Sequence, residues 1–139
     1  MENMQGPEKY ICFKLNKVRR KVNRYYEREL TPFNITPVQF YVLSALWDKD
    51  EVKFKDLAHR LDMDSSTLTG ILDRIEKRGL IKRKEDPSDR RSVLVCLTPK
   101  SKELLLPQMV EIAQDLDQEF RNKLSDEEFQ LLLQLLDRL

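Results

Sequence analysis

The chain has 139 residues, and its 25 Lys and Arg nearly balance 24 Asp and Glu, so the net charge of +1 alone indicates no polyanionic partner. This length suits one domain with its own core, and 35% charged residues with only three glycines favour a helix-rich globular protein over a disordered chain. Two distant cysteines and one histidine argue against a disulfide framework, a zinc site or a catalytic triad, so we expect no metal, no cofactor and no enzyme.

The first predicted element is a long amphipathic helix over residues 8–29. Its apolar residues recur at steps of three and four, which is helical spacing, and they are Ile11, Leu15, Val18, Val22 and Tyr25. Its other face is basic and carries Lys17, Arg19, Arg20, Lys21, Arg24 and Arg28. Such a face is consistent with phosphate contacts and equally with a solvated surface.

Two shorter helices are predicted next. Thr36 and Gln39 have the spacing of a capping box with Pro37 at the first helical position, so a helix should run to about Asp48. We expect it to bury Phe40, Leu43, Leu46 and Trp47. A third, short helix is indicated by apolar residues at i, i+3, i+4 and i+7, which are Phe54, Leu57, Ala58 and Leu61.

A fourth helix and a hairpin are predicted between Asp64 and Thr98. Asp64 can cap this helix, and Gly79 is placed to end it in a left-handed conformation. The apolar stripe of the helix is Leu68, Ile71, Leu72 and Ile75, and its polar face carries Ser66, Thr69, Gly70, Asp73 and Lys77. Two β-prone runs follow, over residues 80–84 and 93–97, joined by a polar turn with Arg90 and Arg91 at its tip.

A polar-faced helix followed by an arginine-tipped hairpin indicates a winged helix-turn-helix, and hence duplex DNA. Hydroxyl residues in the first helical turn suit phosphates and base edges, although alone they are also typical of ordinary capping. Arginines at the hairpin tip suit a narrow minor groove, and we expect Asp89 to hold Arg91 in a bidentate ion pair. The predicted DNA-binding residues are Ser65, Ser66, Thr67, Thr69, Gly70, Arg74, Lys77, Asp89, Arg90 and Arg91.

Two C-terminal helices complete the prediction. The first begins after Thr98 and has the apolar seam Leu105, Met109, Ile112, Leu116 and Phe120, with Pro107 either kinking it or moving its start. The second begins with a capping box at Ser125 and Glu128 and aligns Phe129, Leu132, Leu133, Leu136 and Leu139. The terminal helices are too apolar to stand alone, so we expect them to pack on each other and on a second copy as a homodimer.

At these residues the sequence resembles the MarR family of bacterial winged-helix regulators. The resemblance covers residues 34–40, 68–69, 78–81 and 97–98 and the wing motif Asp86-Pro87-Ser88-Asp89-Arg90-Arg91-Ser92. It implies one domain over residues 1–139, mainly α with a small β-hairpin wing. Residues of about 32–98 would form the winged-helix DNA-binding lobe, and residues of about 8–30 and 99–139 the dimerisation helices. The implied function is a homodimeric regulator of double-stranded DNA at a pseudo-palindromic operator, usually a repressor released by a small molecule or by oxidation.

The resemblance also suggests what is sensed. Cys12, followed by Phe13, is similar to the sensing cysteine of the organic-hydroperoxide (OhrR-like) branch, and Tyr26 matches a tyrosine that contacts this cysteine there. Fourteen residues span about 21 Å of helix, so that contact would come from a partner subunit. A second tyrosine of the branch is replaced by Asn16. Three alternatives stay open: oxidation of Cys12, a small aromatic or phenolic ligand between the dimerisation and DNA-binding parts, or no effector with Cys12 as packing.

A winged helix that binds a protein instead of an operator is the alternative function. It predicts binding that depends little on salt, whereas DNA binding predicts a slope of about 0.9 per neutralised phosphate. The apolar runs are short and interrupted by charge, so we expect no membrane segment, no secretory signal after Met1 and a cytoplasmic location.

Overall fold

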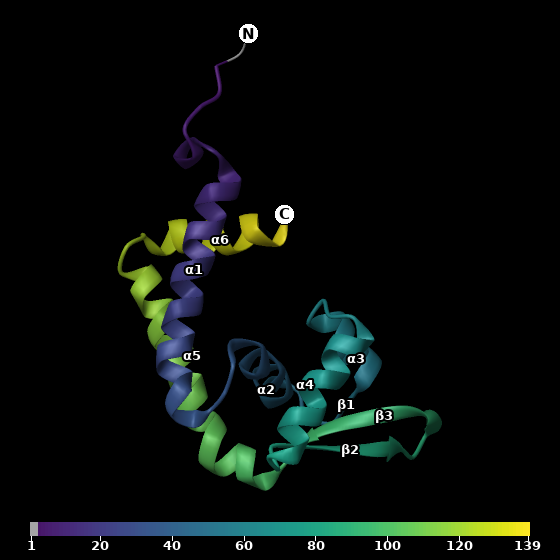
Figure 1. The fold of residues 1–139 in the computed structure, drawn as a ribbon. Helices are drawn as coiled ribbons and strands as arrows, with labels where there is room; N and C mark the ends of the chain where they lie inside the picture. Colours follow the sequence, from purple (N-terminus) through teal and green to yellow (C-terminus); the bar gives the residue numbers. More distant parts are fainter. Residues whose placement is uncertain (1–2) are drawn as a thin grey trace.

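The structure is a computed structural model that describes residues 3–139 as a stalk of helices joined to a winged lobe (Figure 1). The helical stalk consists of α1 (Ile11–Leu30), α5 (Leu106–Arg121) and α6 (Asp126–Asp137). The winged lobe consists of α2 (Pro37–Asp48), β1 (Val52–Lys53), α3 (Phe54–Arg60), α4 (Ser65–Lys77), β2 (Ile81–Asp86) and β3 (Asp89–Leu97). In Figure 1, α1 and α5 lie side by side, α6 crosses α1, and the β2–β3 hairpin projects from the lobe.

The helices of both parts begin at the caps that the sequence predicts. The Thr36 hydroxyl oxygen accepts a hydrogen bond from the Gln39 backbone N–H at 3.2 Å, and the Gln39 side chain accepts one from the Thr36 N–H at 3.1 Å. The Asp64 carboxylate accepts from the Thr67 N–H at 2.7 Å, and Ser125 forms a second capping box at α6. Each cap satisfies backbone donors that a helix end leaves unpaired, which confirms these three starts.

A continuous core joins the stalk to the lobe. The largest fully buried side chains come from both parts and include Leu30, Leu43, Leu46, Leu57, Leu68, Leu72, Ile75, Leu106 and Met109. The Tyr25 hydroxyl also donates to the Ile112 carbonyl at 2.9 Å, which ties α1 to α5. The prediction that Trp47 is buried is wrong, since the residue is 44% exposed in the last turn of α2, next to the fully buried Leu46.

The sheet is antiparallel with strand order β1-β3-β2, and β1 was missed by the sequence because its two residues are defined only by pairing with β3. Strands β2 and β3 extend beyond the predicted runs and meet at a turn of two residues, Pro87 and Ser88. Glu85 pairs with Val93 but Asp86 pairs with Asp89. Residues 90–92 are therefore a bulge on β3, which turns the predicted tip arginines out of the regular ladder.

Of the two effects predicted for Pro107, a kink or a moved start, the structure shows the second, because α5 begins at Leu106. The helical backbone begins at Pro99 and passes through a π-type turn, Ser101–Leu105, before α5 starts at Leu106 with Pro107 in its first turn. Proline cannot donate the hydrogen bond of a regular α-helix, and the wider turn ahead of it accommodates that loss.

Candidate nucleic-acid interface

The first turn of α4 presents its hydroxyl residues to solvent. Ser65, Ser66 and Thr67 are exposed, but the Ser66 hydroxyl donates to the Asp64 carboxylate at 2.8 Å. Together with the Thr67 N–H, this bond lowers the pKa of Asp64. Part of the cluster therefore serves as a cap, whereas the hydroxyls of Ser65 and Thr69 make no hydrogen bond within residues 3–139.

The outward face of α4 continues along the helix without obstruction. Thr69 and Gly70 are exposed, and a methyl group built on Gly70 would meet nothing within 4 Å. One and two turns farther on, Arg74 and Lys77 are exposed and form no ion pair with any residue that the structure describes. The helix therefore offers small side chains near its N-terminus and uncompensated cations near its C-terminus.

Asp73 lies on this same face, and its charge is partly compensated by an arginine of the wing. The Arg83 guanidinium on β2 lies 2.6 Å from an Asp73 carboxylate oxygen and 2.8 Å from a Glu76 carboxylate oxygen. The Arg83 backbone N–H also donates to Glu76 at 3.0 Å. These hydrogen bonds hold the pKa of Glu76 below its ordinary value and raise the pKa of Arg83. The bridge fixes β2 against α4, a contact that the sequence pattern did not reveal because it joins two elements.

At the wing, the expected ion pair between Asp89 and Arg91 does not form. The Asp89 carboxylate instead accepts from the Arg91 backbone N–H at 3.0 Å and from the Ser92 hydroxyl at 3.3 Å. The bulge places the Arg91 N–H and the Ser92 hydroxyl next to the Asp89 carboxylate, as in an Asx-turn. The carboxylate therefore binds these local donors and not the guanidinium group of Arg91. Arg90 and Arg91 are exposed, and within residues 3–139 neither forms an ion pair.

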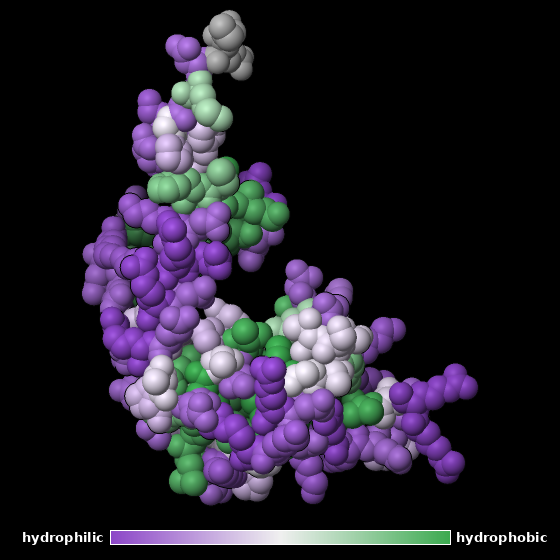
Figure 2. All heavy atoms as spheres, viewed as in Figure 1, coloured by the Kyte–Doolittle hydropathy of each residue, from purple (hydrophilic) through white to green (hydrophobic). Residues whose placement is uncertain are grey.

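A hollow of about 380 Å³ connects α4 with the wing. Its wall includes Lys53, Phe54, Lys55, Thr69, Arg83, Arg91, Ser92 and Val93. Thr69 from the helix and Arg91 from the hairpin thus border the same concave surface. Figure 2 shows strongly hydrophilic side chains at the free end of the hairpin, where the wing projects from the lobe.

The base of the wing is fixed by polar contacts. The Arg78 guanidinium donates to the Phe33 carbonyl at 2.9 Å and also to the Asn34 carbonyl, which joins the end of α4 to the segment before α2. The Thr98 hydroxyl donates to the Gly79 carbonyl at 2.7 Å, and the buried Ser101 hydroxyl donates to the Leu80 carbonyl. The predicted site residues did not include Arg78, Thr98 or Ser101. Residues 78–81 and 97–98 do lie in the segments through which the sequence resembles the MarR family.

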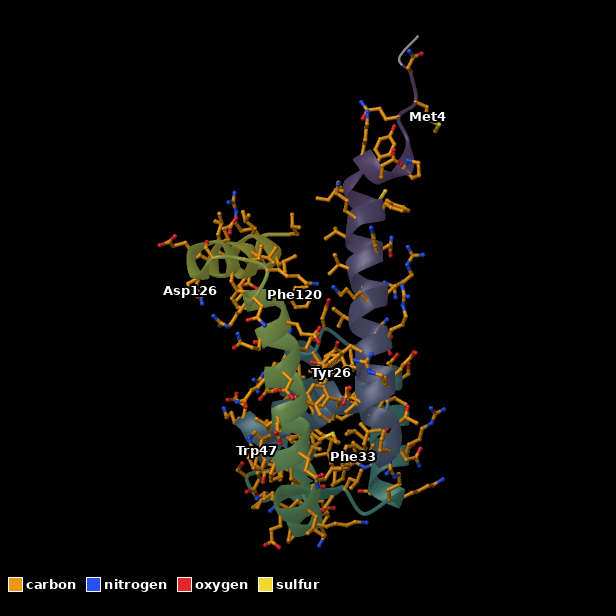
Figure 3. The ribbon with its side chains drawn as sticks, turned by 90° about the vertical axis from the view of Figure 1, so that its left-hand side faces the viewer. Met4, Tyr26, Phe33, Trp47, Phe120 and Asp126 are labelled. Atoms are coloured by element: carbon orange, nitrogen blue, oxygen red, sulfur yellow. The ribbon has the colours of Figure 1, made fainter. Side chains whose placement is uncertain are left out.

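The two candidate sensor residues lie apart within one chain. Cys12 is exposed in the first turn of α1, where the Asn16 amide donates to the Cys12 backbone carbonyl at 3.0 Å. Tyr26 is buried, and its ring centroid lies 5.1 Å from that of Phe40. Burial raises the pKa of Tyr26 to about 12. Figure 3 places Tyr26 toward the lobe end of α1, with Met4 beyond the opposite end.

Residues 3–139 contain no helix with the length and apolarity needed to cross a membrane. The same residues hold no group of three His, Cys, Asp or Glu side chains arranged to bind a metal ion.

Comparison with known proteins agrees with this architecture. The model of the MarR family matches residues 35–93. The HTH-type transcriptional regulator MgrA of Staphylococcus aureus is 36% identical over 110 residues, covering 78% of this chain and 74% of the relative. The organic hydroperoxide resistance transcriptional regulator of Bacillus subtilis is 40% identical over 91 residues, covering 66% and 62%. A mutant MarR from E. coli, solved with operator DNA, is 31% identical with a TM-score of 0.79 and 89% of each chain covered. The chain therefore belongs to the MarR family of transcriptional regulators.

Proposed function

We propose that this protein is a homodimer that binds a pseudo-palindromic operator in double-stranded DNA. In each subunit the outward face of α4 enters a major groove, with Ser65, Ser66, Thr67, Thr69 and Gly70 near the bases and Arg74 and Lys77 toward the flanking phosphates. Arg90 and Arg91 of the wing enter the adjacent minor groove, and Asp89 shapes the bulge that carries them.

The observation that carries this proposal is the shared surface of α4 and the wing. Thr69 and Arg91 line one hollow, and the four cations Arg74, Lys77, Arg90 and Arg91 are exposed without an ion pair in the described part of the chain. Carboxylates within the surface are already bound by Arg83 or by backbone and hydroxyl donors. Arg83 is shared by two carboxylates and Asp89 has no cationic partner within residues 3–139, but the four free cations outnumber the acids that remain. The face therefore keeps a positive balance that favours a polyanion.

Exposed apolar residues support the dimer. Ile11 and Leu15 on α1 are 64% and 44% exposed, and α6 exposes Leu131, Leu133, Leu135 and Leu136. Figure 2 shows hydrophobic residues gathered where the C-terminal half of α6 passes α1. A second copy that covers these helices would remove this apolar area from water and hold two α4 helices at half-sites about 34 Å apart.

Fluorescence anisotropy on the DNA upstream of the protein's own gene tests operator binding. We expect tight binding to that duplex, much weaker binding to a shuffled duplex, and a steep fall in affinity with salt. Equal affinity for both duplexes would contradict recognition of a specific operator. Binding insensitive to salt would favour the alternative of a protein-interaction module.

Release of the operator would follow either oxidation of Cys12 or binding of a small aromatic or phenolic ligand. The similarity to an organic hydroperoxide regulator and the exposure of Cys12 support the oxidative route. In this route Tyr26 of one subunit would contact Cys12 of the other, because both lie on one rigid helix within a chain. Addition of an organic hydroperoxide should then release the DNA, and added thiol should restore binding. If hydroperoxide releases the unmodified protein from DNA but leaves the Cys12→Ser variant bound, Cys12 is the oxidised sensor. If it releases both proteins, Cys12 is not the sensor.

A further inference from the structure

A basic groove runs between α1 and α5, away from α4 and the wing. It encloses about 740 Å³ and is lined by Lys14, Lys17, Val18, Lys21, Arg24, Tyr25, Arg28, Leu116 and Glu119. Its apolar wall comes from Val18, Tyr25 and Leu116, and its rim is formed by the cations. Figure 3 looks toward α1 and α5 side by side, and Figure 2 shows hydrophilic side chains covering the middle of α1.

The positive charge of this groove is only partly compensated. Lys14, Lys17, Lys21 and Arg24 form no ion pair within residues 3–139, and Arg28 pairs only with its neighbour Glu29. The side chain of Lys123 adjoins Lys21 and holds the pKa of Lys21 below its ordinary value. On the acidic side, Glu119 lines the groove, and Asp115 and Glu29 lie near Tyr25. The cations still exceed these acids, so an anionic occupant would relieve the repulsion.

The cations also follow a regular order along α1. Lys14, Lys17, Lys21, Arg24 and Arg28 are separated by alternating steps of three and four residues, so they form one stripe about 21 Å long. The apolar residues Val18 and Tyr25 border the same stripe. A second helix lying in the groove would match it with an apolar face and with acidic residues at the same alternating spacing, as charged flanks do in coiled coils.

We propose that the α1–α5 groove is a docking site for an acidic amphipathic helix of another protein. Charge distribution favours this occupant over the chain's own α6 in a second copy, because the acids at the start of α6, Asp126, Glu127 and Glu128, occupy a single turn. The basic stripe instead extends over four turns of α1. A nucleic acid would match the charge but would leave the apolar wall of the groove uncovered. The proposal is independent of operator binding by α4 and the wing.

The test uses the full chain and a synthetic fluorescent helical peptide with leucines on one face and glutamates at alternating steps of three and four. We expect binding by anisotropy that weakens with salt. The charge-reversed variant Lys17→Glu/Lys21→Glu should raise Kd at least about tenfold. The matched control Arg19→Glu/Arg20→Glu, with the same change of charge on other faces of α1, should change Kd by less than about twofold.

Four outcomes would overturn the proposal. The first is that the peptide fails to bind, and the second is that a scrambled peptide of equal composition binds equally well. The third is that both double variants weaken binding alike, which would indicate general charge attraction. The fourth is that the Lys17→Glu/Lys21→Glu variant becomes monomeric by light scattering or loses affinity for non-operator duplex. That result would assign the groove to a second copy or to nucleic acid. Circular dichroism of both variants establishes that each remains folded.

Discussion

Asp73 and Asp89 lie within a surface proposed to meet phosphates, and each is bound by the protein itself. Arg83 pairs with Asp73 and also with Glu76, whereas backbone and hydroxyl donors hold Asp89. The two carboxylates thereby organise the surface, one by joining the wing to α4 and one by shaping the bulge that presents Arg90 and Arg91. A negative residue in a DNA-facing pattern is therefore compatible with DNA binding when its partners lie within the protein.

The proposed minor-groove role of Arg91 can be tested by its removal. The Arg91 guanidinium is exposed and forms no ion pair within residues 3–139, so it is free to contact DNA. We therefore expect Arg91→Ala to weaken operator binding by at least about 1 kcal/mol. Anisotropy titrations at fixed salt measure the change. Lys49→Ala removes an equal charge from an exposed site on the lobe and should leave Kd nearly unchanged. Equal losses in the two variants would contradict a specific role for Arg91.

Arg83→Ala removes the bridge between the wing and α4. Because the three partners are partly exposed, we expect a loss of only about 1 kcal/mol in the free energy of unfolding, together with weaker operator binding. Chemical denaturation and anisotropy measure the two effects. Lys84→Ala, which removes an exposed ion pair with Glu51, is the matched control and should spare DNA affinity. A variant with normal affinity would show that the bridge does not position the wing.

The bridge also predicts a pH dependence. Hydrogen bonds from Arg83 lower the pKa of Glu76 below 4.5, so the folded state favours its charged form. The stability from this group is present above about pH 4.5 and is lost as pH falls through the lowered pKa. The difference in unfolding free energy between the unmodified protein and Arg83→Ala should therefore shrink below that pH. A difference that stays constant from neutral to acid pH would mean that Glu76 does not depend on Arg83.

At the scale of elements, Gly70 inside α4 and Gly79 just after it should respond in opposite ways to replacement by alanine. Gly79 follows the helix with φ of +73°, and neither Gly79 nor Gly70 has an atom within 4 Å of an added methyl group. Gly79→Ala should cost about 1 kcal/mol of stability through backbone strain, and Gly70→Ala should gain about 0.5–1 kcal/mol inside the helix. Thermal denaturation checks both. A gain with Gly79→Ala would refute the left-handed requirement, and a loss with Gly70→Ala would indicate an unseen contact.

The elements that the sequence predicted well are those with local signals. Thr36, Asp64 and Ser125 act within three residues of their own helices, so their capping patterns are visible in a linear chain. Features set by distant partners could not be predicted in this way. Strand β1 exists through Val52 and Val95, and Arg83 meets α4 across a turn. The prediction of an ion pair between Asp89 and Arg91 was wrong because the bulge at residues 90–92 brings the Arg91 backbone N–H to the Asp89 carboxylate.

At the scale of the whole molecule, substitutions on the exposed apolar face of α6 test whether this helix forms the dimer interface. Leu133→Glu/Leu136→Glu places two charges on exposed apolar positions, so we expect a monomer by light scattering. Operator affinity should fall by about 10²–10⁴, because each half-site would be bound without the effective concentration that linkage provides. Gln134→Glu on the same helix adds charge at an exposed polar position and should remain dimeric. A dimer that persists with both leucines replaced would place the subunit contact elsewhere.

The hydrogen bonds at the base of the wing connect the helical run that leads into α5 with the start of the hairpin. Ser101 and Thr98 donate to the backbone carbonyls of Leu80 and Gly79, so hydrogen bonds connect the beginning of this helical run to the residues directly before β2. The 16 residues of α5 extend for about 24 Å, and a tilt of about 5° displaces one end relative to the other by about 2 Å. In a dimer with opposed subunits this displacement doubles between the two wings. In the proposed dimer, a side-chain-sized disturbance in the stalk would therefore be large enough to change the fit of the two wings to the pitch of B-DNA.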